Sequence, residues 1–167
     1  MGDVRPLSDR KAVEKIRHIA KGEIAMLCTF PPGGLMQARP MGTCHIDDEG
    51  QIWFLSRKDS AKNRDIEANP RVELLYAVPG RSEYMAIEGI ASISRDPAKI
   101  DDFWNPLAKT WFTAGKEDPS ITLIRVTTTG GHYWDTKHNK MVQLGAIAIG
   151  ALFGKTMDDG VEGALDV

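Results

Sequence analysis

The chain has 167 residues, 42% of them hydrophobic, and a formal net charge of −2 at pH 7. This length predicts one globular domain with its own core, and the small net charge of mixed signs argues against the strongly basic surface of a nucleic-acid-binding domain. No apolar run reaches the length of a membrane helix and no basic, then apolar N-terminus marks a signal peptide, so we expect a cytoplasmic protein without membrane association.

The two cysteines, Cys28 and Cys44, are too few for a disulfide framework and lack metal-ligand spacing. We expect both to be free thiols in a reducing compartment. The histidines show no pair at ligand spacing, so we predict no metal site. These histidines are His18, His45, His132 and His138.

The first part of the chain predicts a helix followed by a strand. After a loose lead-in at residues 1–7, Ser8 is a suitable N-cap, and Gly22 is a natural stop for a helix with one apolar face. Residues 23–30 carry a single charge, at the first position, and predict a largely buried strand. Residues 31–34, two prolines and two glycines, predict a turn.

Residues 35–46 predict a second strand, and a polar turn at 47–50 connects it to a third strand at 52–55. Pro40 cannot donate to a sheet ladder, so the second strand should be irregular or lie at a sheet edge there, beside Arg39. The third strand is a run of aromatic and branched residues, typical of a strand buried on both faces.

A short helix after the third strand combines several signals. Ser60 is a suitable N-cap, and Asn69 before Pro70 predicts the end of the helix. Hydroxyls and cations gather at its start, and a helix N-terminus with such groups is a reasonable phosphate site. A solvated basic turn is the alternative. The groups are Ser56, Arg57, Lys58, Ser60, Lys62 and Arg64.

Residues 71–78 alternate in polarity and predict a strand that ends at Pro79 and Gly80 in a type II turn. The next strand, at 82–95, carries Gly89 in its interior, which indicates a bulge or a close backbone contact.

Asp96 and Pro97 predict a helix start, with an N-cap followed by proline at the first helical position. Pro106 should kink or interrupt this helix before Trp111. Its apolar stripe consists of Ile100, Phe103, Trp104 and Leu107.

Residues 121–129 predict a strand, and Gly130 and Gly131 should bend the chain into a last short strand at 132–136. The apolar stretch from Met141 has three interpretations: a packing helix, a dimer arm or a partly ordered tail. The acidic, glycine-rich end from Lys155 is expected to be mobile.

Six or seven strands in hairpin-like succession, with few helices, predict a mainly β fold: an antiparallel barrel with peripheral helices. Side chains fill the inside of such a barrel. A cofactor would therefore sit outside the barrel or between subunits.

Five pieces of the chain occur in the order found in a known family. They are Arg39-Pro40-Met41, the run from Trp53 to Lys62, the following IEANPRV, Glu88 to Ile93, and HYWD ending at Asp135. Together they resemble the flavin-binding split barrels related to pyridoxamine-phosphate oxidase, closest to their bacterial general stress protein branch. The resemblance spans about residues 8–136.

The resemblance implies a split antiparallel β-barrel at residues 1–136 with a C-terminal extension at 137–167. It implies a homodimer that binds two FMN molecules in clefts between the subunits. In that family a basic residue on the second strand and a lysine just inside the helix after the third strand hold the phosphate. These roles fall on Arg39 and Lys62, with Ser56 and Ser60 as hydroxyl donors.

The resemblance also assigns groups around the flavin ring. Backbone groups around Pro40, Met41 and Leu55 would flank the isoalloxazine. Trp111 and Trp134 are candidates to cover the flavin from the partner chain, with ordinary core packing as the alternative for both. Arg57 and Lys58 precede the helix cap, and we expect them to be solvated.

The leading functional interpretation is a redox-active, FMN-binding stress protein that uses the chemistry of its flavin. No residue is a convincing general acid or base. His45, on the second strand, could face the cleft, but a structural role is the alternative for it. The related oxidase grips its substrate with an Arg-x-His motif just after the terminal tryptophan, and here Trp134 is followed by no arginine. Vitamin B6 oxidation is therefore not expected. The alternatives are a pyridoxamine-phosphate oxidase, a deazaflavin-dependent reductase, and a non-catalytic flavin carrier or sensor.

Overall fold

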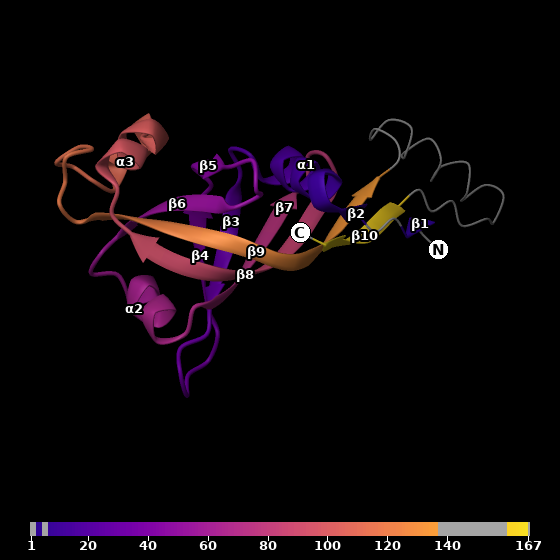
Figure 1. Ribbon diagram of the computed structural model, residues 1–167, viewed down its shortest axis with the longest axis horizontal. Coiled ribbons are helices and arrows are strands. Elements are labelled where there is room, and N and C mark those ends of the chain that lie inside the picture. Colours follow the sequence, from indigo (N-terminus) through magenta and orange to yellow (C-terminus); the bar gives the residue numbers. More distant parts are fainter. Residues whose placement is uncertain (1–2, 5–6, 137–159, 167) are drawn as a thin grey trace.

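The structure is a computed structural model that describes residues 3–4, 7–136 and 160–166. Figure 1 shows a curled sheet with α1 and α3 on one side and α2 on the other. The strands are β1 (Asp3–Val4), β2 (Leu7–Ser8), β3 (Ile24–Thr29), β4 (Gln37–Gly42), β5 (His45–Ile46), β6 (Ile52–Arg57), β7 (Arg71–Val78), β8 (Glu83–Ser94), β9 (Ile121–Thr136) and β10 (Gly160–Asp166). The helices are α1 (Asp9–Ala20), α2 (Ala61–Ala68), α3 (Pro97–Phe103) and the 3-10 helix η1 (Pro106–Thr110).

The sheet is antiparallel along the path β4-β3-β7-β8-β9. The edge of the long strand β9 that faces away from β8 has two partners. β6 pairs with the first half of β9, and β10 pairs with its second half. The curl of the sheet brings β6 next to β4, but the ladders of the described strands do not join these two. We call this open line between β4 and β6 the seam. A barrel open along one line is a split antiparallel barrel, as the sequence predicts.

The core lies inside the barrel and beneath α1. Strand β7 shows why the residues segregate: Val72, Leu74, Tyr76 and Val78 are buried, whereas the alternate side chains point outward. The apolar face of α1 closes the cluster, with Ile16 and Ile19 at 0% exposure.

A second, smaller core lies under α3 and η1. It gathers Ile100 and Phe112 from this segment and Trp53 and Leu123 from β6 and β9. β6 is therefore covered on both faces, as predicted. The helix itself stops at Phe103 and Pro106 begins a separate 3-10 helix, so the predicted interruption before Trp111 is confirmed.

Two predictions about backbone geometry are confirmed. Pro40 lies on β4, the last strand of the path, where its missing N–H costs little. The β8–β9 register shifts between Glu88 and Gly89. A Cβ atom on Gly89 would lie 2.5 Å from Val126 Cγ1 and 2.9 Å from the Thr127 carbonyl oxygen, so the bulge and the close contact coincide.

The predicted type II turn after β7 is wrong. Such a turn needs a positive φ at Gly80, but Ser82 is the residue in the left-handed region, with φ 56°. Backbone bonds run from Arg81 N to Val78 O and from Ser82 N to Pro79 O, at 2.9 and 3.2 Å. The chain makes two overlapping turns here instead of one.

The predicted bend at Gly130 and Gly131 is also wrong, because β9 runs through both glycines as one 16-residue strand. A Cβ atom on Gly131 would lie 2.5 Å from the Ala86 carbonyl oxygen. This glycine serves close strand packing, not a change of direction.

The two ends of the chain correct further expectations. β1 and β2 pair in parallel with β10, so part of the expected loose lead-in belongs to the sheet. The sequence predicts a mobile acidic end, but β10 in this part of the chain pairs with β9 and buries Val161 and Leu165. The apolar stretch that begins at Met141 lies outside the described residues. No helix among the described residues is long and apolar enough to span a membrane.

Candidate functional site

The start of α2 forms as predicted. Ser60 has extended backbone angles and its Oγ accepts from the Asn63 N–H at 3.4 Å. Asn69 ends the helix before Pro70. The first N–H groups of a helix have no intrahelical acceptor, so those of Ala61 and Lys62 point out of the helix end toward any bound anion.

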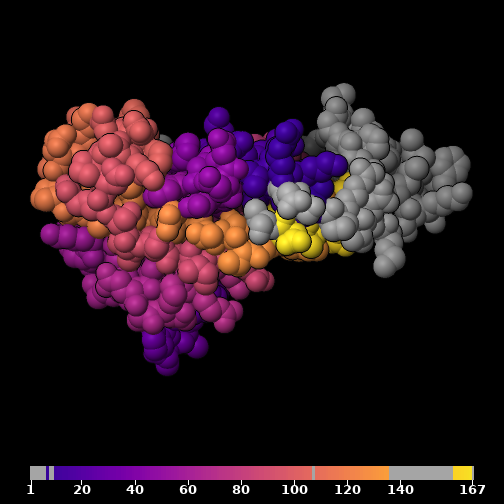
Figure 2. All heavy atoms as spheres, in the orientation of Figure 1, coloured from indigo at the N-terminus to yellow at the C-terminus, as the bar shows by residue number. Residues whose placement is uncertain are grey.

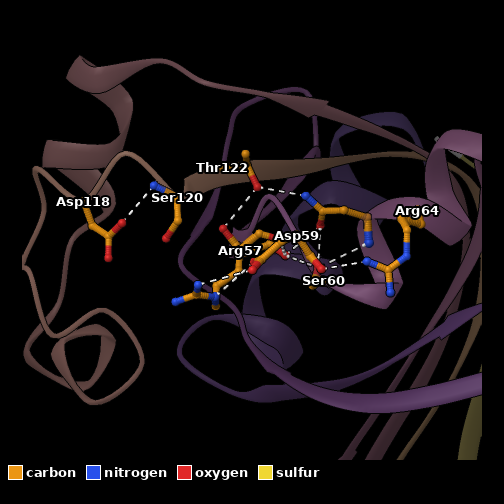
Figure 3. Close-up of polar contacts among 9 residues, drawn as sticks. Arg57, Asp59, Ser60, Arg64, Asp118, Ser120 and Thr122 are labelled. Atoms are coloured by element: carbon orange, nitrogen blue, oxygen red, sulfur yellow. Dashed lines mark hydrogen bonds and ion pairs between the residues drawn. The ribbon is translucent and has the colours of Figure 1, made fainter.

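A buried polar network fixes this helix end to the sheet (Figure 3). Ser56 Oγ donates to Asn63 Oδ1 at 2.7 Å, and Asn63 Nδ2 donates to Thr122 Oγ1 at 3.0 Å. Thr122 Oγ1 in turn donates to the Ser56 carbonyl oxygen at 3.1 Å. Ser56 is 2% exposed, and its hydroxyl also lies 3.3 Å from Ser60 Oγ. Ser56 and Ser60 therefore hold the helix start in place relative to β6 and β9.

Arg39 reaches the same helix from β4. Its Nη1 donates to Thr29 Oγ1 at 2.8 Å and its Nη2 to Asp65 Oδ2 at 3.3 Å. The side chains of Arg39 and Asp65 are 22% and 16% exposed. The structure thus places the predicted arginine at the predicted helix, but in contact with two residues that the sequence did not mark.

Lys62 is half-buried in the first turn of α2. Among the described residues its ammonium has no hydrogen-bond or ion-pair partner. Burial lowers the pKa of Lys62, and the positive charge of Arg39 lowers it further, against a smaller opposing effect of Asp59. Two cations that interact unfavourably beside free backbone donors form a site in which a dianion would be stabilised.

The other cations of this segment are engaged elsewhere or solvated. Arg57 pairs with Asp59 at 3.1 Å, and Arg64 Nη1 donates to the Asp59 carbonyl oxygen at 2.7 Å (Figure 3). Arg57 and Lys58 are exposed, as predicted. Lys62 is distinguished from its neighbours by burial and by proximity to Arg39.

The residues assigned to the flavin ring line the two sides of the seam. Met41 is partly buried against the main core, whereas Pro40 is exposed opposite Met26. On the other side, Leu55 packs against the second core. The thiol of Cys44, just after β4, donates to the Gly42 carbonyl oxygen at 3.6 Å. Burial is the main reason that the pKa of Cys44 is raised.

His45 does not join these groups. Its ring stacks on Phe103 of α3, with ring centroids 4.7 Å apart and planes 12° apart. This contact favours the structural role that the sequence left open.

The two tryptophans lie apart from each other. Trp111 is 74% exposed in the lobe formed by α3, η1 and the turns that follow, which Figure 2 shows at one end of the molecule. Trp134 is 41% exposed on the half of β9 that pairs with β10, whereas β6 pairs with the other half. The alternative interpretation of Trp111, ordinary core packing, is therefore wrong. Within one chain, Trp134 lies on a different part of the sheet from the start of α2.

An apolar patch covers the outward side of β3, β7, β8 and β9. The ladder register places Met26 beside Leu75 and Tyr84 beside Trp134. β3 is largely buried, as predicted, but its residues Ile24 and Met26 are 62% and 39% exposed. This outer patch consists of Ile24, Met26, Leu75, Tyr84 and Trp134, and the pair Glu73 and Glu88 separates it from the exposed Ile90.

Sequence reasoning missed Thr29, Asp65, Asn63 and Thr122. Asp65 carried one usable signal, since it follows Lys62 by three residues and so shares its face of the helix. Thr29 and Thr122 are ordinary strand residues in the sequence. Only the fold shows that they meet α2.

Comparisons with known proteins agree with this fold. A general stress protein 26 from Jannaschia sp. CCS1 has 25% identity and a TM-score of 0.76, covering 91% of this chain and 95% of that one. A general stress FMN/FAD binding protein from Xanthomonas citri has 26% identity and a TM-score of 0.65, covering 77% and 90%. Protein bli-3 of Neurospora crassa is 24% identical over 131 residues, which are 73% of this chain and 63% of that protein's length.

The profile of one family matches residues 11–158, which include the seam, α2 and the second half of β9. The split barrel and the order of its elements fit that match. The chain belongs to the Pyridoxamine 5'-phosphate oxidase like family.

Proposed function

We propose that this protein is an FMN-binding general stress protein that acts as a flavin-dependent oxidoreductase. The observation that carries the proposal is the pair of cations at the start of α2. Lys62 is half-buried without a partner among the described residues, next to Arg39, and its pKa is lowered. A phosphate monoester would relieve both the repulsion and the desolvation.

The residues present fit the phosphate of FMN. Lys62 would contribute its ammonium, Arg39 the donors not used by Thr29 and Asp65, and the first turn of α2 its free N–H groups. The buried network of Ser56 and Asn63 keeps that turn in place before the ligand arrives. Preorganised donors of this kind lose little freedom on binding.

The seam supplies the remaining part of the proposed site. Pro40 and Met41 on one side and Leu55 on the other would flank the isoalloxazine with backbone and apolar groups. The flavin supplies the hydride or electron chemistry when bound, and the protein supplies orientation and exclusion of water. Similarity to an FMN/FAD binding protein supports a flavin rather than another phosphate ester.

We further propose a homodimer, supported by the outer patch. Five large apolar side chains between 39% and 62% exposed on one sheet face mark an interaction surface. A second copy would bury them, and Trp134 and Tyr84 would then come from the partner to the flavin. A C2 dimer satisfies this with a single type of surface.

The test of the cofactor is the absorbance spectrum and mass of the small molecule that co-purifies with the full chain. We expect a flavin spectrum and the mass of FMN. Retention of a deazaflavin, or failure of added FMN to bind, would contradict the proposal. Reduction of the bound flavin by NADPH or NADH, followed by reoxidation with turnover, tests the oxidoreductase part. A bound flavin that no donor reduces would leave a carrier or sensor instead.

A further inference from the structure

Asp65 closes a triangle of polar contacts behind the proposed phosphate site. Its Oδ2 accepts from Thr29 Oγ1 at 2.7 Å and from Arg39 Nη2 at 3.3 Å. Thr29 Oγ1 accepts in turn from Arg39 Nη1 at 2.8 Å. The three side chains come from β3, β4 and α2, so the triangle ties the helix to the two strands on one side of the seam.

The triangle is shielded from water. Thr29 is 0% exposed, and the side chains of Arg39 and Asp65 are 22% and 16% exposed. Thr29 and Asp65 are the hydrogen-bond partners of Arg39 among the described residues. A guanidinium that donates from both Nη atoms to neighbouring oxygens is fixed in its plane as well as in its position.

By charge alone, Asp65 is unfavourable in an anion site. A carboxylate near a phosphate repels it, and the repulsion is stronger in a partly buried place than in water. Asp65 also lies three residues after Lys62 on the same helix, yet it does not pair with the lysine. Asp65 pairs with Arg39 instead, so the ammonium of Lys62 can contact a ligand. The contact through which Asp65 can affect the site is therefore its pairing with Arg39, whose guanidinium it orients.

We propose that Asp65 is a positioning residue for the phosphate of FMN: together with Thr29 it holds the Arg39 guanidinium beside the start of α2. The inference rests on the proposed function, since it assigns the phosphate to this place. Asp65 itself makes no contact with the cofactor in this proposal.

The test is a fluorescence titration of the apoprotein with FMN and, in parallel, with riboflavin, which lacks the phosphate. Asp65→Ala should weaken FMN binding about tenfold and leave riboflavin binding unchanged, as expected for losing part of a charge-assisted contact. Asp65→Asn keeps an oxygen that accepts from both donors and should stay within about threefold of the wild type. Glu67→Ala removes a charge from an exposed position on the same helix and should change neither affinity.

A double-mutant cycle isolates the route through the arginine. If Asp65 acts through Arg39, the loss caused by Asp65→Ala should vanish in an Arg39→Ala background. Thr29→Val should reproduce the FMN-specific loss and Thr29→Ser should restore binding, which keeps the test valid if Asp65→Ala does not fold.

Three results would overturn the positioning role. They are unchanged or tighter FMN binding in Asp65→Ala, an equal loss of riboflavin binding, or a loss that persists without Arg39. Failure of the proposed function is distinguishable from these. It would show as wild-type protein that binds FMN and riboflavin equally and as Arg39→Ala with unchanged FMN affinity, whatever Asp65→Ala does.

Discussion

Lys62 shows how a single residue can be unfavourable for folding and favourable for binding. Burial disfavours its charged form, and the nearby Arg39 adds repulsion, so its pKa is lowered. The positive end of the helix dipole acts in the same direction. The folded, ligand-free protein therefore binds the lysine proton less tightly than the unfolded chain does. A bound dianion would reverse the balance, and in the proposed site this would link FMN affinity to protonation.

The sign of this linkage gives a pH prediction. Below the lowered pKa of Lys62 the ammonium is charged in the free and bound states, so affinity is constant there. As the pH rises through that lowered pKa, the free protein loses the proton that the complex retains, and FMN affinity should fall. The measurement is the ratio of FMN to riboflavin affinity between about pH 7 and about pH 10, since the phosphate, with pKa about 6, is already a dianion there. In Lys62→Met this affinity ratio should not change with pH. A ratio that does not change with pH in the wild type would contradict the assignment of Lys62 to the phosphate.

Asp135 bears on the question of substrate. The related oxidases hold pyridoxamine phosphate with an arginine just after the terminal tryptophan, and here the next residue is Asp135, which pairs with Lys15 at 2.7 Å. A carboxylate would repel a substrate phosphate. We expect no saturable oxidation of pyridoxamine phosphate by the FMN-loaded protein. Hydrogen peroxide release at an ordinary enzymatic rate of about 1 per second or faster would show this expectation to be wrong.

Among the elements, α2 could be predicted in detail and β9 could not. The signals of α2 are local: the Ser60 cap and the Asn69–Pro70 stop act on neighbouring backbone groups. Two successive glycines, Gly130 and Gly131, are typical of a bend in the sequence. In the structure, the close approach of Ala86 on the neighbouring strand explains the need for Gly131 instead. The partners of Arg39 were missed for the same reason, because Thr29 and Asp65 are distant in sequence and meet only in the fold. β10 joins the sheet because β9 is long enough to offer it an edge.

Gly89 tests how tightly β8 and β9 are packed at the bulge. Gly89→Ala would place a Cβ atom 2.9 Å from the Thr127 carbonyl oxygen, and backbone atoms cannot move aside as a flexible side chain can. We expect a loss of about 1–3 kcal/mol in the free energy of unfolding. Gly80→Ala is the matched control, because a Cβ there meets no atom within 4 Å and φ is not positive. Urea unfolding of both variants should separate them, and equal stabilities would contradict the close approach.

At the scale of the whole molecule, the outer patch connects oligomeric state to cofactor binding. Leu75 lies near its centre, 41% exposed and paired in register with Met26 and Ala86. Leu75→Glu should convert the proposed dimer to a monomer near 18.4 kDa and weaken FMN binding, since the partner would no longer cover the flavin. Lys11→Glu, on the exposed side of α1, is the control.

Sedimentation equilibrium measures the effect of the Leu75 change on mass, and an FMN fluorescence titration measures its effect on affinity. A wild-type monomer that binds FMN tightly would contradict the shared cleft. So would a Leu75→Glu monomer that keeps wild-type affinity, because the outer patch would then have no part in the site.

The central claim is that the start of α2 holds the phosphate of FMN, and the most direct measurement compares Lys62→Ala, Lys58→Ala and the wild type by FMN fluorescence titration at moderate salt. Loss of one charge-assisted contact of about 1.5–3 kcal/mol should weaken FMN binding roughly tenfold to a hundredfold in Lys62→Ala. Lys58→Ala should bind like the wild type, because that side chain is exposed outside the cap. Equal affinity of Lys62→Ala and the wild type, or a larger loss in Lys58→Ala, would place the phosphate elsewhere.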